Sequence, residues 1–166
     1  FSKIMQRKLG WSRYGNPKYV SAVYRYLVFS SNGKWGSPFV GKDWNSRVSS
    51  DFGWRTDPLN GKKAFHEGLD IAYPTGTKIH AVSGGVVTSV VYSKTGYGHH
   101  VRVDCGNGVT VLYAHCSKIL VTKGQSISTG QPIAEVGATG RVTGAHLHLG
   151  ALVNGKEVNP REYIGG

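Results

Sequence analysis

The chain has 166 residues, a length that suits one domain with a sizeable core. Its 24 glycines, nine tyrosines and many valines favour a mainly β protein with tight turns, and the lack of an apolar stretch of about 18 residues excludes a membrane span. The formal net charge of +11 predicts binding to anionic polymers; because no metal-finger spacing or RNP-type aromatic pattern accompanies it, we expect no nucleic-acid partner.

The positive charge is concentrated at the start of the chain. Residues 1–42 contain eight Lys or Arg and no acidic residue. Asn16-Pro17 has the pattern of an N-cap followed by proline at the first helical position, and apolar residues then recur at helical spacing, which predicts one amphipathic helix at about residues 17–29. We therefore expect a basic N-terminal segment with one helix and a linker, residues 1–37, followed by a main domain, residues 38–166. No signal peptide is visible, and the start without Met suggests a piece of a longer protein.

From Pro38 onward the pattern changes to short strands and turns. Asn107-Gly108 suits a turn that needs positive φ and predicts a hairpin. In this register Cys105 and Cys116 lie on the order of 20 Å apart, which predicts free thiols, with Cys116 a small buried hydrophobe. The predicted strands cover residues 64–71, 78–82, 85–91, 99–105, 109–115, 121–127, 130–136 and the stretch around 144–149.

A candidate metal half-site lies in the first of these strands. His66, Gly68 and Asp70 share one face of an extended chain, so an imidazole and a carboxylate point the same way. A zincin-type helix would instead require a second His where Asp70 stands, and Gly68 within the segment disfavours a helix. We therefore prefer the strand and exclude Glu67 from the site.

A second group of histidines lies further along the chain. His146 and His148 project from the same face of a strand, and Tyr113 and His115 share a face in the preceding hairpin. Imidazoles can bind metal ions and transfer protons near neutral pH. The remaining histidines offer no second pair on one face: His80, His99 and His100.

Three motifs in this order resemble the lysostaphin and LytM type of zinc metalloendopeptidase, which cuts peptide bonds of bacterial peptidoglycan. They are His-x-x-x-Asp at 66–70, Tyr-Ala-His at 113–115, and Gly-x-Thr-Gly-x-x-Thr-Gly-x-His-Leu-His at 137–148. The resemblance covers roughly residues 38–160 and includes Phe-Gly-Trp-Arg at 52–55. It implies a mostly antiparallel β fold whose substrate groove has a sheet as its floor and loops as its walls.

The resemblance also implies roles for five residues. His66, Asp70 and His148 match the zinc ligands, while His115 and His146 match the two catalytic histidines beside the metal. Three protein ligands leave a fourth tetrahedral position for water, and the residual charge of +1 acidifies that water toward a pKa of about 7. We expect His146 to be the general base, because a ligand two residues away fixes its distance to the metal, and His115 to stabilise the oxyanion or protonate the leaving amine.

The resemblance leaves open which cross-link is cut. Leu149-Gly150 stands where many relatives have Phe-Glu. Cys116 stands where Leu is usual, and His99 stands where Asn is common. None of these changes removes a site residue.

Anionic cell-wall polymers are the expected partners of the basic segment, in which residues 14–20 resemble the closing helix of lysozyme-like wall-hydrolase domains. We expect an extracellular or cell-wall protein whose parent is secreted, phage-borne or part of a conjugation machine. One alternative is a catalytically inactive wall-binding or regulatory module of the same fold, which the presence of all five site residues disfavours. The other is a lipoyl- or biotinyl-type carrier, suggested by residues 121–136 but lacking the required Lys on a tight hairpin.

Overall fold

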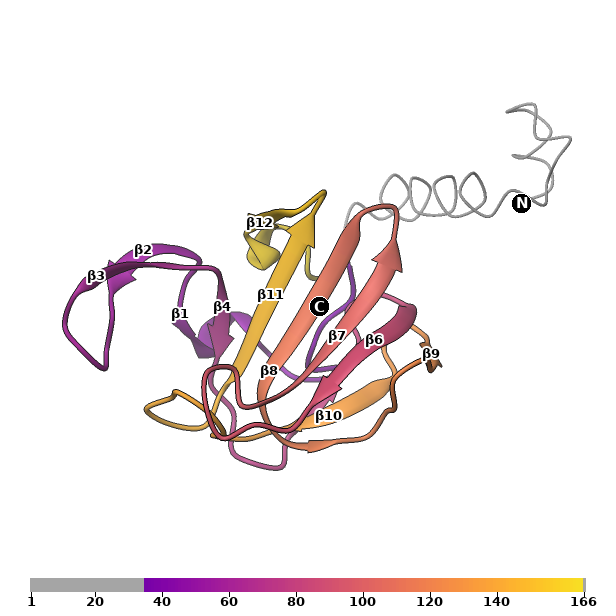
Figure 1. Cartoon of the computed structure of the whole chain (residues 1–166), viewed down its shortest axis with the longest axis horizontal. Coiled ribbons are helices and arrows are strands. Elements are labelled where there is room, and N and C mark those ends of the chain that lie inside the picture. The colour runs from indigo at the N-terminus through magenta and orange to yellow at the C-terminus, as the bar shows by residue number, and fades with distance from the viewer. Residues whose placement is uncertain (1–34, 166) are drawn as a thin grey trace, which may run out of the picture.

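The computed structural model describes residues 35–165, so the helix predicted at 17–29 lies outside the described residues. Within them a ten-stranded sheet has the main order β1-β4-β11-β8-β7-β6-β9, with β5, β10 and β12 attached to it (Figure 1). The strands β2 and β3 form a separate two-stranded arm that projects from the body. Every pairing between these strands is antiparallel, which confirms the predicted mainly β fold.

The elements are short, as the frequent turn residues predict, and the described part of the chain contains no helix that could cross a membrane. The elements are η1 (Asn45–Arg47), β1 (Val48–Ser50), β2 (Gly53–Thr56), β3 (Lys63–His66), β4 (Gly68–Ile71), β5 (Lys78–His80), β6 (Gly85–Val91), β7 (His99–Gly106), β8 (Val109–Ile119), β9 (Ser126–Ile127), β10 (Pro132–Val136), β11 (Leu147–Val153), β12 (Lys156–Val158) and η2 (Pro160–Glu162).

The predicted hairpin is confirmed by β7 and β8. Asn107 and Gly108 at its turn have φ values of 50° and 81°, the left-handed region that an Asn-Gly step adopts at low cost. Cys105 and Cys116 form no disulfide in the described structure, and Cys116 is fully buried, as predicted.

The strand predicted over residues 64–71 is instead two strands. Its first half, β3, pairs with β2 in the arm, whereas its second half, β4, pairs with β1 and β11 in the main sheet. The chain changes sheets at Glu67 because the two halves have different partners: β3 pairs with β2, whereas β4 pairs with β1 and with β11, which lies almost eighty residues away. The strand predicted at 121–127 is likewise reduced to β9.

The core lies on one face of the central strands, and the opposite face carries the candidate site. Leu149 of β11 is paired with Leu69 of β4 and with Tyr113 of β8, and all three are fully buried. One position earlier, His148 is paired with Asp70. Because side chains alternate along a strand, the same register that buries the leucines places His148 and Asp70 together on the other face.

A close approach between β4 and β11 requires glycine at position 68. A Cβ atom at Gly68 would lie 2.6 Å from the Leu149 carbonyl oxygen and 2.7 Å from Nε2 of His148. We expect Gly68→Ala to reduce the free energy of unfolding by about 1–3 kcal/mol, the usual cost of overpacking, as measured by urea denaturation. Gly144→Ala is the matched control, since a Cβ there meets open space. Equal stability of the two variants would contradict this interpretation.

Candidate metal centre and cleft

A cleft of about 570 Å³ lies between the main sheet and the arm. Asp70 of β4 and His148 of β11 line it from the sheet, Arg55 and Phe65 line it from the arm, and residues 141–143 line it from the loop before β11. This arrangement agrees with the groove that the resemblance implies. The cleft is therefore the natural place to examine the five residues selected from the sequence.

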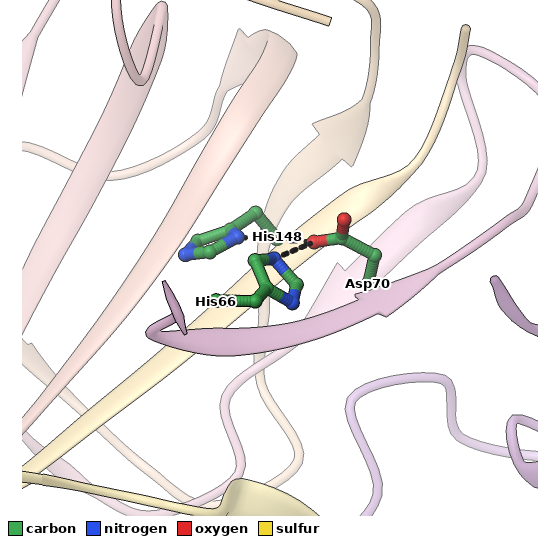
Figure 2. A group of neighbouring side chains, drawn as sticks. All are labelled: His66, Asp70 and His148. Carbon is green, nitrogen blue, oxygen red and sulfur yellow. Dashed lines mark hydrogen bonds and ion pairs between the residues drawn. The ribbon is translucent and has the colours of Figure 1, made fainter. Parts of the chain in front are cut away.

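Three of these residues meet at one point, although each comes from a different strand (Figure 2). Oδ1 of Asp70 lies 3.1 Å from Nε2 of His66 and 3.0 Å from Nδ1 of His148. The three candidate ligand atoms lie within 4.8 Å of one another, and all three residues are buried. The division of the predicted strand at Glu67 does not separate His66 from Asp70, because β3 ends with the imidazole directed toward the carboxylate.

The donor set fits a divalent metal ion. Two imidazole nitrogens and one carboxylate oxygen form one of the ligand sets that bind catalytic zinc and leave a fourth position open. Burial alone would raise the pKa of Asp70, but hydrogen bonds from His148 and His66 outweigh it and hold the pKa well below its usual range. The carboxylate is thus ionised at neutral pH and available as a ligand.

A backbone carbonyl orients the ring of His66. Its Nδ1 lies 2.9 Å from the carbonyl oxygen of Asp51. A carbonyl oxygen can only accept a hydrogen bond, so Nδ1 carries a proton, and Nε2 is the nitrogen left for a metal ion when the ring is neutral. This contact fixes the tautomer that metal binding through Nε2 requires.

His115 and His146 are held in the same tautomer beside the three candidate ligands. Nδ1 of His115 donates to the carbonyl oxygen of Thr139 at 2.7 Å, and Nδ1 of His146 donates to that of Gly144 at 2.9 Å. Their ring centroids are 5.0 Å apart, and Nε2 of His146 lies 3.6 Å from Oδ1 of Asp70. When neutral, both rings therefore have a free Nε2 that can accept a proton.

The backbone at His115 departs from regular strand geometry. His115 has φ of 64°, and β8 carries one more residue than β7 between the pairs Val101–Tyr113 and His99–Cys116. Such a bulge resets the alternation of side chains. Tyr113 consequently faces the core while His115 faces the cleft, so the prediction that they share a face is wrong.

The structure thus brings all five residues into the cleft, and it adds others that sequence reasoning did not select. The ring of Tyr97 lies with its centroid 5.4 Å from that of His148. Arg141 donates to the carboxylate of Asp57 at 3.1 and 3.3 Å and so joins the loop to the arm. No sequence spacing signals these contacts, because each connects distant parts of the chain. The other described histidines do not line the cleft: His80, His99 and His100.

Burial of His115 makes the metal-free protein sensitive to acid. Burial lowers the pKa of His115 to about 4 from an ordinary value of 6.5. Between these values the unfolded chain binds a proton that the folded chain does not, so stability falls as the pH drops from about 6.5 to 4 and this contribution then levels off. We expect His115→Gln to show a smaller decrease, measured by urea denaturation in chelator across this range. The control is His80→Gln, and a decrease as large as wild type in His115→Gln would contradict the assignment.

Comparisons with known proteins agree with this geometry. The model of a family described as "Peptidase family M23" matches residues 64–160, which include all five site residues. The chain is 43% identical over 114 residues to the peptidoglycan DD-endopeptidase ShyA of Vibrio cholerae, covering 68% of this chain and 26% of ShyA. It spans about a quarter of the length of the curated relatives that it matches first.

Solved structures to which the chain is similar are also peptidases. A zinc-containing peptidase from Vibrio cholerae is 36% identical with a TM-score of 0.63, over 68% of this chain and 35% of the other. The catalytic domain of lysostaphin from Staphylococcus simulans is 28% identical with a TM-score of 0.61, over 69% of this chain and 88% of the other. These similarities confirm the resemblance that the sequence motifs indicate.

Proposed function

The chain belongs to peptidase family M23, and on this premise we propose that it is a zinc-dependent endopeptidase that hydrolyses peptide bonds in the stem peptides or cross-bridges of bacterial peptidoglycan. The observation that carries the proposal is the convergence of three candidate ligands and two further histidines in one cleft. The names of the relatives ShyA and lysostaphin support the substrate class and the reaction.

In this proposal His66, Asp70 and His148 hold one Zn²⁺ ion. Zinc in such a site is a Lewis acid that lowers the pKa of a coordinated water and polarises the carbonyl to be attacked. The chain contributes a fixed donor set, because the Asp51 carbonyl orients His66 and the pairing of β4 with β11 sets His148 opposite Asp70.

The two remaining histidines move protons. We assign the role of general base to His146, because its Nδ1 donates to the Gly144 carbonyl and its Nε2, which lies on the side of the candidate ligands, is the nitrogen left to accept a proton. His115 is then placed to stabilise the oxyanion or to protonate the leaving amine. Its lowered pKa keeps the ring neutral at pH 7, so protonation of an amine by His115 requires that it first receive a proton during the reaction.

Digestion of purified peptidoglycan tests the proposal. We expect soluble products with new amino termini, identified by mass spectrometry, and loss of the activity in chelator with recovery on addition of zinc. New reducing sugar ends would instead indicate a glycosidase. Binding to the wall without any cleavage by the zinc-loaded protein would favour the inactive wall-binding module.

We further propose that the protein acts outside the cell or at the cell wall, and that residues 1–37 form a basic segment that precedes the enzyme domain at 38–166. Trp35, near the end of this segment, packs into the core of that domain. Phosphate and carboxylate polymers of the wall would attract this segment electrostatically. We expect binding to purified walls to weaken strongly between about 50 and 500 mM salt, measured by sedimentation. Binding that does not change over this range would contradict an electrostatic role.

A further inference from the structure

Two arginines line the cleft, and they differ in their partners. Arg141 donates to both carboxylate oxygens of Asp57. The side chain of Arg55, in β2, makes one hydrogen bond among the described residues, from Nη1 to Oγ of Ser50 at 3.1 Å, and forms no ion pair with any of them. Most of the five N–H groups of the Arg55 guanidinium are therefore not engaged by the described residues.

Arg55 lies close to the candidate metal centre. Ser50, its hydrogen-bond partner, has Oγ 3.4 Å from Nδ1 of His66, so two consecutive contacts connect the guanidinium to a candidate ligand. The cross-strand partner of Arg55 is Ala64, a side chain too short to cover the guanidinium. The guanidinium is thus held by Ser50 through one N–H group, and the side chain of Arg55 lines the cleft.

The carboxylates of the cleft do not neutralise Arg55. Asp70 is engaged by His66 and His148, and Glu67 forms no ion pair with Arg55 in the described structure. A partly buried guanidinium with free N–H groups matches a carboxylate, which it can bind through two parallel hydrogen bonds. The complementary group must then come from the ligand that enters the cleft.

We propose that Arg55 binds a carboxylate of the substrate and selects peptides that carry an acidic group near the bond to be cut. This inference rests on the proposed endopeptidase function. Nη1 of Arg55 is separated from the His66 ring by two contacts of 3.1 and 3.4 Å. An extended peptide advances about 3.3–3.6 Å per residue, so a group held by Arg55 belongs to a residue one or two positions from the scissile bond. Arg55 is in this sense a residue that determines specificity for an anionic peptide.

Two forms of one cross-linked peptidoglycan stem peptide test the proposal. In the first the carboxylates next to the cross-link are free, and in the second they are amidated. We expect the wild-type protein to prefer the acidic form by about tenfold or more in kcat/KM, mainly through KM, as a charge-assisted hydrogen bond predicts. Arg55→Gln should lose this preference by weakening the acidic form alone, whereas Arg55→Lys should retain part of it.

Controls separate substrate binding from a merely structural role. Lys63→Gln removes an equal charge from the same arm at an exposed side chain that does not line the cleft, and it should leave the preference unchanged. Arg55→Gln should bind zinc with wild-type affinity. If it weakens zinc binding and slows both peptides equally, Arg55 instead orients His66 through Ser50 and the proposal is overturned.

Calorimetric binding of the two peptides to the metal-free protein distinguishes failure of this inference from failure of the proposed function. Preferential binding of the acidic form without hydrolysis by the zinc-loaded protein supports the Arg55 site and contradicts the endopeptidase. Hydrolysis of both forms at equal rates and with equal affinities supports the endopeptidase and overturns the Arg55 site. Binding of neither peptide, with no hydrolysis, overturns both.

Discussion

Replacement of Asp70 by Asn is expected to remove the bound metal and to lower peptidoglycan hydrolysis by at least about a thousandfold. Oδ1 of Asp70 is the atom shared by both histidine contacts, at 3.1 Å to His66 and 3.0 Å to His148. Asparagine keeps the shape of the side chain but removes its negative charge, so two neutral imidazoles and a weakly donating amide remain. The metal content of the purified protein and its turnover should therefore fall together.

Glu67→Gln is the matched control for this experiment. Glu67 lies three residues before Asp70 and lines the same cleft, but it is exposed, and its side chain forms no ion pair with the candidate ligands in the described structure. The variant loses one negative charge as Asp70→Asn does, and we expect it to keep one equivalent of metal. An Asp70→Asn protein that retains both its metal and its activity would show that the metal centre is assigned wrongly.

The second large effect is expected for His146→Gln, which should retain the metal and lose about a hundredfold to ten-thousandfold in kcat. The Nδ1–H group of His146 is held by the Gly144 carbonyl, so that Nε2 is left as the proton acceptor on the side of Asp70. Glutamine can form hydrogen bonds but does not accept a proton near neutral pH. The variant should therefore bind substrate and release almost no product.

His115→Gln is the comparison that assigns the base. The two histidines have the same tautomer and their ring centroids are 5.0 Å apart, but His115 is buried more deeply. If His146 is the base, His115→Gln should keep a larger share of the wild-type kcat than His146→Gln does. Near wild-type turnover of His146→Gln with zinc bound would transfer the role of base to His115.

Much of the architecture follows from local sequence patterns. Asn107-Gly108 predicts the hairpin correctly because its turn depends only on the backbone preferences of these two residues. The spacing of two between His146 and His148 predicts a shared face correctly, and both side chains line the cleft. His66 and Asp70 also meet, although the chain changes sheets between them. The mainly β fold follows in the same way from frequent glycines and short runs of strand-forming residues.

Other features depend on partners that are distant in the sequence. The sequence by itself determined which five residues belong together and in which class of fold. Only the tertiary structure decided that the segment around Glu67 joins two sheets and that the bulge at His115 turns its ring from the face of Tyr113 into the cleft. It also decided that Asp57 neutralises Arg141, while Arg55 has no carboxylate partner within residues 35–165. Strand pairing and ion pairs across a cleft join residues dozens of positions apart, and no local periodicity records which of them meet.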